Sequence, residues 1–236
     1  PLAPGPWIMA QSWHDLLFAH WPITYETLRP TLPSGLELDT YDGAAWVGVV
    51  PFRMSGVRPR GLVAAPWLSA FPELNVRTYV TLGNKPGVFF YALDAANPVA
   101  VQIARRWFRL PYFNARMSMR RDGDQIVYAS ERTHTGAAPA VFRAAYRPIG
   151  AEFRAQPGSL EHWLTERYAL YTVDERGRLY RGDIHHAPWP LQPAAAHFEI
   201  NTMAAAHGIT LPDQAPLLHF AQRLDVAVWP LQRVAQ

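Results

Sequence analysis

The chain has 236 residues, with 22 lysines and arginines against 19 aspartates and glutamates, and a formal charge of +3. Its length suits one large domain or two small ones, and a composition that is 49% hydrophobic and 13% aromatic supplies a packed core and excludes general disorder. The arginines are scattered and form no basic stripe or tail, which argues against nucleic-acid binding. No apolar run approaches the roughly 18 residues of a membrane span, so we expect no membrane segment.

Lysine and cysteine usage restricts the chemistry. The chain contains one lysine, Lys85, and no cysteine, so a Schiff-base amine and a thiolate are almost excluded as covalent catalysts. Lys85 lies in the sequence Gly-Asn-Lys-Pro-Gly, which predicts an exposed turn where a solvated lysine makes a poor nucleophile. The lack of cysteine excludes disulfides and thiolate metal sites and fits a cytoplasmic protein.

Short strands dominate the predicted secondary structure. Residues 1–10 are expected to form an extended arm, and residues 25–29 a short helix stopped by Pro30. Further helices are expected at 98–108 and at 159–167, where Ser159 is the N-cap. Strands are expected at 44–53, 74–82, 88–93, 117–121, 125–130, 140–146, 168–173, 179–182 and 224–229. This pattern predicts one α+β domain over residues 1–236, mainly β, built on a closed or nearly closed antiparallel sheet.

The first candidate site is a polar row in the strand near residue 75. Because side chains alternate along a strand, one face carries the carboxyl, amide, guanidinium and phenol groups of Glu73, Asn75, Arg77 and Tyr79. The row could line a polar cavity, with Arg77 binding a substrate carboxylate. Alternation alone favours the simpler interpretation, an ordinary strand whose polar side faces water.

The second candidate is the exit of the predicted helix at 98–108. Pro111 ends this helix, so Tyr112 and Phe113 enter the next strand at a bend, where functional side chains are often presented. Trp107 belongs to the same segment. On residue type alone, the two strand aromatics are more simply interpreted as core.

Histidines give a weaker signal. His185 and His186 are adjacent, so on a strand they point to opposite faces and do not chelate one metal well. His14 and His20 are six residues apart, which is not a metal spacing on a helix, and we expect neither a metal nor another cofactor. One histidine of the adjacent pair could lie at a pocket rim, and we take His185 as the candidate.

Several of these segments together resemble the YqjF-like family of uncharacterised bacterial proteins, a branch of the acetoacetate decarboxylase-like superfamily. The resemblance spans nearly the whole chain and rests on residues 13–22, 36–39, 46–54, 69–80, 180–186 and 217–231. It implies a single domain with a cone-like, mainly antiparallel β-barrel around an apolar cavity and two or three short helices.

The resemblance also implies what has been lost. In the decarboxylase, a Pro-Lys-Lys-x-Ala segment supplies the Schiff-base lysine and a second lysine that lowers its pKa. The segment that matches by position is Pro111-Tyr112-Phe113-Asn114-Ala115, which has neither lysine. A phenol and a phenyl ring form no imine, so we expect a protein that is not a Schiff-base decarboxylase.

Two further positions follow from the resemblance. The family's active-site carboxylate, in a Tyr-x-Glu segment, matches Glu73, with Asn75 as a competing alignment. An arginine early in the decarboxylase falls near His14, which leaves Arg77 to recognise an acidic ligand. The resemblance therefore shifts our interpretation of the polar row toward a cavity-facing one.

We accordingly expect a protein that binds a small, partly apolar molecule bearing a carboxylate or carbonyl, with or without acid–base chemistry. Glu73 and Arg77 would be the catalytic groups, and the ligand-binding groups would be Asn75, Tyr79, Trp107, Tyr112, Phe113, His14 and His185. The alternative is a non-catalytic structural or interaction protein with a filled barrel. Both leave the oligomeric state open.

Overall fold

The computed structural model describes residues 3–64 and 69–234. It contains three α-helices: α1 (Tyr25–Leu28), α2 (Pro98–Trp107) and α3 (Leu160–Thr165). The strands are β1 (Met9–Ile23), β2 (Glu37–Leu38), β3 (Ala45–Pro59), β4 (Phe71–Leu82), β5 (Lys85–Ala95), β6 (Tyr112–Asp122), β7 (Gln125–Arg132), β8 (Val141–Pro148), β9 (Ala169–Val173), β10 (Leu179–His186), β11 (Leu191–Asn201), β12 (Leu217–Val228) and β13 (Gln232–Arg233).

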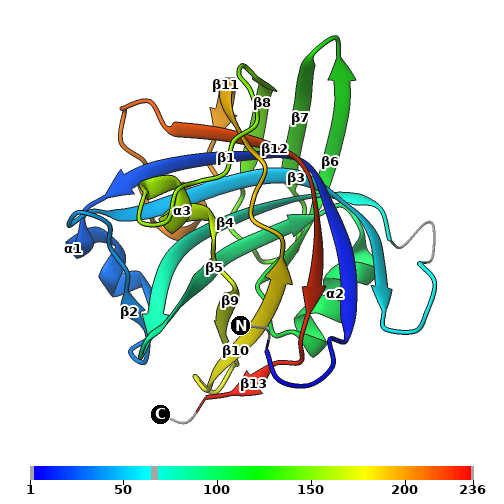
Figure 1. Cartoon of the computed structure of the whole chain (residues 1–236), viewed down its shortest axis with the longest axis vertical. Helices are drawn as coiled ribbons and strands as arrows, with labels where there is room; N and C mark the ends of the chain where they lie inside the picture. The colour runs from blue at the N-terminus through cyan, green and yellow to red at the C-terminus, as the bar shows by residue number, and fades with distance from the viewer. Residues whose placement is uncertain (1–2, 65–68, 235–236) are drawn as a thin grey trace.

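Five long strands form the centre of the molecule, in the order β12, β1, β3, β4 and β5, and all four contacts between neighbours are antiparallel. Figure 1 shows β1, β3, β4 and β5 crossing the middle of the molecule, with β6, β7, β8 and β11 above them and β9, β10 and α2 below. Both faces of the central sheet are therefore covered.

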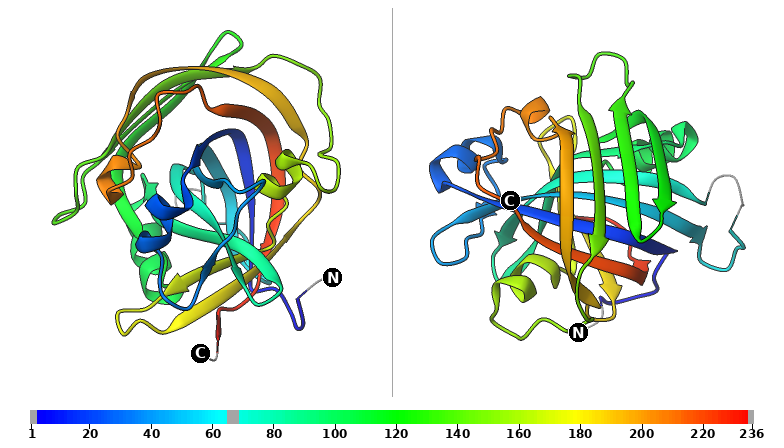
Figure 2. Two further views of the ribbon diagram at one scale, coloured as in Figure 1. Left: turned by 90° about the vertical axis from the view of Figure 1, so that its left-hand side faces the viewer. Right: turned by 90° about the horizontal axis from the view of Figure 1, so that it is seen from above.

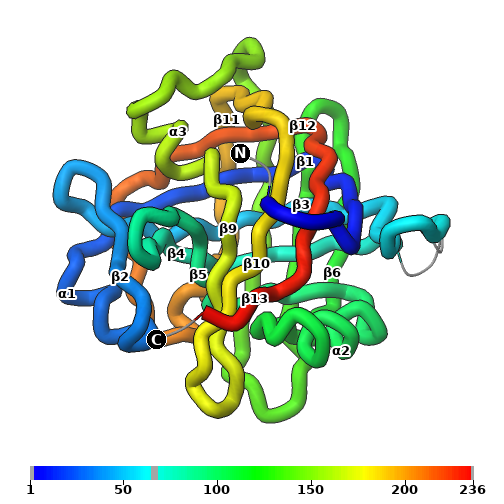
Figure 3. Tube along the Cα trace, turned by 60° about the horizontal axis from the view of Figure 1, so that its bottom comes forward, coloured from blue at the N-terminus to red at the C-terminus, as the bar shows by residue number. Residues whose placement is uncertain are grey.

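The covering strands close two rings that share the central sheet. On one side, β9 pairs with β5 and β10 pairs with β12, which closes a ring of seven strands. On the other side, β6, β7, β8 and β11 span from β5 to β12 and close a ring of nine. Figure 2 shows the arch of β8 and β11, and Figure 3 shows β9 and β10 crossing the opposite face.

Two pairings depart from the antiparallel prediction, because β5 runs parallel to both β6 and β9. Parallel neighbours cannot be joined by a tight turn and need a crossover connection. Helix α2 supplies that connection between β5 and β6. It starts at Pro98, and the side chain of Asn97 accepts hydrogen bonds from the backbone N–H groups of Val99 and Ala100, so the predicted N-terminus is confirmed.

Most predicted elements are present, including the β4–β5 and β6–β7 hairpins and the Ser159 cap of α3. The predicted N-terminal arm is too long, since β1 already begins at Met9. Strands β1, β2, β11 and β13 were not predicted; in β11, Pro193 and three alanines give little β-propensity. In the described parts of the chain no helix is long and apolar enough to cross a bilayer.

The closure of the seven-stranded ring gives a test of the fold. A Cβ on Gly87 would lie 2.6 Å from the carbonyl oxygen of Ala169 and 2.7 Å from the ring of Tyr171, so β5 and β9 approach too closely for a side chain. We predict that Gly87→Ala lowers the free energy of unfolding by about 1–3 kcal/mol, as overpacking does, measured by urea denaturation.

Gly182→Ala in β10 is the matched control. Its Cβ would meet only the branched ends of Leu170 and Leu231, at 3.1 Å, and these side chains can move aside. A smaller loss is expected for this variant. Equal losses in the two variants would contradict the steric account of the β5–β9 contact.

Candidate functional site

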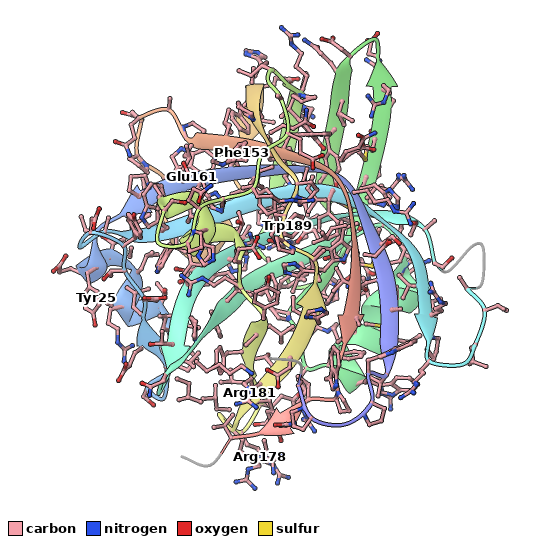
Figure 4. All side chains as sticks on the ribbon, in the orientation of Figure 1. Tyr25, Phe153, Glu161, Arg178, Arg181 and Trp189 are labelled. Carbon is pink, nitrogen blue, oxygen red and sulfur yellow. The ribbon has the colours of Figure 1, made fainter. Side chains whose placement is uncertain are left out.

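A cavity of about 490 Å³ lies inside the seven-stranded ring. Its walls are mostly apolar and come from the central sheet, from β10 and from one face of α2. Apolar lining side chains include Leu16, Val50, Phe52, Met54, Phe71, Leu93, Ile103, Phe108, Leu170 and Trp189. Figure 4 shows Trp189 in the middle of the molecule, whereas Arg178 and Arg181 lie at the edge of the molecule, near the start of β10. The nine-stranded ring instead encloses a large hydrophobic core.

The polar row of β4 lines this cavity. Glu73, Asn75 and Arg77 all belong to the lining, while Leu74 and Val76 between them are fully buried in the core of the other ring. Glu73 is 2% exposed and Asn75 is 5% exposed. The structure therefore brings together three of the four side chains that alternation placed on one face. These three side chains line the cavity and do not face bulk water.

The carboxyl group of Glu73 is held in a low-polarity environment. Burial raises the pKa of Glu73 to about 8; the hydrogen bond that Tyr112 donates to it opposes this shift, and the nearby Asp94 adds to it. The distance from the Tyr112 hydroxyl to Oε2 is 2.8 Å. Near neutral pH, Glu73 is thus largely protonated and sits beside a phenol that can orient it.

Arg77 has no carboxylate partner among the described residues. Its guanidinium lies 5.3 Å from the ring centre of Phe18 and 5.9 Å from that of Tyr79, and its Nε is buried without a hydrogen-bond partner. Gly48 leaves room beside it, because a Cβ there would lie 3.0 Å from the His20 ring and 3.5 Å from Cγ of Arg77. The result is an uncompensated cation at a largely apolar cavity.

Sequence reasoning missed several polar side chains of the same cavity, among them Arg167 and His186. Arg167 lies two residues after α3, is 6% exposed and bonds to Asp39 at 2.7 Å. His186 is 2% exposed; its Nδ1 bonds to the carbonyl of Ala187 at 2.8 Å, and burial lowers its pKa. Because these residues come from segments about a hundred positions away from β4, no local pattern could have found them. The sequence predicted that the two adjacent histidines point to opposite faces of their strand. Since the inner face of β10 is buried, His186 is the histidine that lines the cavity, and His185 is not.

The exit of α2 is divided between the two rings. Tyr112 lines the cavity, but Phe113 points the other way, as alternation along β6 requires. Phe113 packs with the guanidinium of Arg132 at 4.2 Å and with His134 at 5.5 Å, so its predicted place in the cavity is wrong. Trp107 does line the cavity and is 72% exposed.

Three other predicted ligand-binding residues lie elsewhere. His185 is exposed on the outer face of β10. His14 lies in a surface depression with Arg53 and Arg223 and bonds to Ser55 at 2.7 Å. Tyr79 does not line the cavity; it packs in a separate buried cluster, and its hydroxyl bonds to His20 at 2.7 Å.

The misplacement of His14 has a local cause. Asp15 has φ of 52°, and the pairing of β1 with β3 shifts register between His14 and Ala19. Such an irregularity changes which side chains face inward. Trp13 and Leu16, three positions apart, therefore both line the cavity, and His14 faces outward.

Lys85 begins β5, immediately after the turn, and forms an ion pair with Asp183 of β10. Its side chain is 39% exposed. Lys85 is not among the residues that line the cavity. The turn was predicted correctly, but the lysine is anchored and not free at a loop tip.

The closed sheet with its cavity has an acetoacetate decarboxylase-like fold, as comparison with solved structures shows. The chain superposes on an acetoacetate decarboxylase-like enzyme from Sphingomonas wittichii RW1 with a TM-score of 0.65, over 100% of this chain and 97% of that one, at 14% identity. It superposes on the enduracididine biosynthesis enzyme MppR with a TM-score of 0.67, over 98% and 90% of the two chains, at 13% identity. At such identities the likeness is one of fold.

Sequence comparison gives the family. Residues 10–225 match the DUF2071 family, described as an uncharacterized conserved protein. The chain is also 53% identical over 229 residues to the uncharacterized protein YqjF of Bacillus subtilis (strain 168), covering 97% of this chain and 93% of that protein. The chain therefore belongs to the DUF2071 family, as the resemblance implied.

The raised pKa of Glu73 predicts a pH dependence of stability. An unfolded glutamate with a pKa near 4.5 loses its proton well before the folded Glu73, whose pKa is about 8. Between these values the folded state binds the extra proton, so Glu73 contributes less stability as pH rises. Glu73→Gln lacks this titration. The unfolding free energy of Glu73→Gln minus that of the unsubstituted protein should therefore increase with pH, by up to about 1.4 kcal/mol per pH unit between pH 5 and 8.

Urea denaturation at pH 5.5 and 7.5 measures this difference. Glu175→Gln, at an exposed loop position, is the control and should follow the unsubstituted protein at both pH values. If the difference in unfolding free energy between Glu73→Gln and the unsubstituted protein is the same at both pH values, the inference that the buried carboxyl is protonated near neutral pH is wrong.

Proposed function

We propose that this protein binds a small, partly apolar molecule with a carboxylate or carbonyl group in the cavity of the seven-stranded ring, and that Glu73 and Arg77 act on it. The observation that carries this proposal is a carboxyl, an amide and a guanidinium in one row of a largely apolar cavity. Asn75 Oδ1 and Arg77 Nε are buried there without hydrogen-bond partners. Buried polar groups in native proteins are nearly always paired, so a bound molecule is the natural partner.

The chemistry that fits these groups is proton transfer beside a carbonyl. A carboxyl group with a pKa of about 8 is poised near neutrality and can donate or accept a proton. Tyr112 holds it by a single hydrogen bond and leaves its other oxygen for a ligand. Arg77 would stabilise an enolate that forms, or bind a carboxylate that the ligand already carries, since a fixed cation in a low-polarity site acts strongly on negative charge.

The structural neighbours support the ligand class without defining the reaction. One structure of MppR is described as a complex with the condensation product of pyruvate and imidazole 4-carboxaldehyde, and another as a complex with pyruvate. Ligands of that kind combine a carbonyl or its adduct with a carboxylate. A filled, non-catalytic barrel is the less favoured alternative, because an open cavity of about 490 Å³ is the opposite of what it requires.

A thermal-shift screen with keto acids, enols and hydrophobic ligands tests the proposal. A ligand of the native site raises the apparent unfolding temperature by mass action. Glu73→Gln and Arg77→Ala should each weaken that ligand by roughly 10- to 100-fold, the effect of losing a hydrogen bond to a charged or strongly polar group.

The exposed ion pair of Arg116 and Glu131 provides matched controls with the same residue types. Glu131→Gln and Arg116→Ala should leave every ligand shift unchanged. A screen without a hit, or hits that survive both cavity substitutions, would count against the proposed site.

We also propose that no imine forms on the chain's only lysine, since Lys85 is engaged with Asp183 and does not line the cavity. Incubation with acetoacetate and borohydride should therefore leave the intact mass unchanged, because reduction traps only an imine. An added mass that peptide mapping assigns to Lys85 would restore the decarboxylase mechanism.

A further inference from the structure

The cavity has two chemically different ends. Its exposed lining residues are Ile8, Pro59 and Trp107, so the cavity opens where the start of β1, the end of β3 and α2 meet. The opposite end contains Arg77 and the buried Arg167, which follows α3. In Figure 1, α2 and α3 lie on opposite sides of the molecule.

The order of residues along β4 gives the depth of each group. Phe71, Glu73, Asn75 and Arg77 succeed one another from the open end inward, since Met54 of β3, near the opening, pairs with Phe71. At about 3.3 Å per residue, Phe71 and Arg77 are roughly 20 Å apart along the strand. The cavity is thus a long passage with a cationic inner end.

Two guanidinium groups lie beside the same aromatic ring at that inner end. The central carbon of Arg77 lies 5.9 Å from the ring centre of Tyr79, and that of Arg167 lies 5.2 Å from the same ring. Arg167 is paired with Asp39, but Arg77 has no carboxylate partner among the residues described. The pair therefore carries excess positive charge, and burial together with the nearby Arg77 lowers the pKa of Arg167.

Hydrogen-bond donors are also left over. Nε of Arg77 and Nη2 of Arg167 are both buried and have no partner in the protein. An anion with two or more oxygen atoms can accept from both guanidinium groups, and a carboxylate matches their planar geometry. Two unmatched donors on two neighbouring cations favour an anionic head group at this end of the cavity.

We propose that the ligand is an amphiphilic carboxylate, whose head group binds Arg77 and Arg167 at the inner end and whose apolar body extends along the cavity toward Trp107. This inference rests on the proposed function and names its ligand class. A keto acid of three or four carbons would fill only the inner end. An extended apolar body would also cover Leu16, Phe52, Leu93 and Ile103, which line the passage between the two ends.

Glu73 lies partway along this path. Because burial keeps its carboxyl group protonated near neutral pH, it does not repel an anionic ligand that passes it. A carbonyl or hydroxyl group in the body of the ligand would come within its reach. The position of Glu73 thus fits an amphiphile with a second polar group a few bonds from the head.

Isothermal titration calorimetry with three probes tests the head group and the body separately. Decanoate has both, 1-decanol has the body without the charge, and butyrate has the charge without the long body. Decanoate is expected to bind at least about tenfold more tightly than either of the others, since each lacks one class of contact. Arg77→Met and Arg167→Gln should weaken decanoate by roughly 10- to 100-fold and leave decanol unchanged.

Two further variants make the result specific. Arg106→Gln removes a charge from the exposed face of α2 and should leave decanoate binding unchanged. Ala104→Trp places a large ring in the cavity lining and should weaken decanoate and decanol alike. Arg77→Met keeps the Arg167–Asp39 ion pair, so it decides the question even if Arg167→Gln does not fold.

Equal binding of decanoate and decanol, with both weakened by Ala104→Trp, would overturn the carboxylate head group and leave the cavity as a binding site. Tighter binding of butyrate than of decanoate, lost in Arg77→Met, would overturn the long apolar body alone. If none of the probes binds and the thermal-shift screen is also empty, both this inference and the proposed function fail.

Discussion

The constraint on which this structure depends is that the middle of one five-stranded sheet is buried on both faces. There, consecutive residues of β3, β4 and β5 alternate between the interiors of two rings, so each of these strands must satisfy two different environments at once. On the nine-stranded side the side chains fill a hydrophobic core, and on the seven-stranded side they leave a cavity. A slip of one residue in any of these strands would exchange the two sets and destroy both.

The central sheet also fixes the positions of polar side chains whose burial costs free energy. Glu73, Asn75 and Arg77 are fixed by the same backbone hydrogen bonds that hold Leu74 and Val76 in the core of the other ring. The sheet thus maintains the geometry of the polar row whether or not a ligand is bound. Pre-organisation of this kind would reduce the ordering cost of the proposed binding, and the unmatched donors and acceptors would supply its specificity.

Local sequence patterns predicted what depends on neighbouring residues. The β4–β5 hairpin follows from its turn, and the shared face of the polar row follows from the period of a strand. Arg167 was beyond such reasoning because it reaches the cavity only through closure of the ring by β9 and β10. His14 was assigned from its position in the resemblance, which does not show that Asp15, a left-handed residue, interrupts the alternation of β1 and leaves His14 facing outward. Strand β11 exists through its pairing with β8 and β12 and not through propensity.

Helix α2 has a consequence for how such a protein can diversify. The parallel pairing of β5 and β6 obliges the chain to cross over, and the helix that makes this crossing also lines the cavity through Ile103 and Ala104 and its opening through Trp107. No strand of either ring relies on those side chains for its hydrogen bonds. Substitutions on one face of α2 can therefore change the shape and polarity of the opening while the sheet stays intact, so the opening can vary or be redesigned independently of the fold.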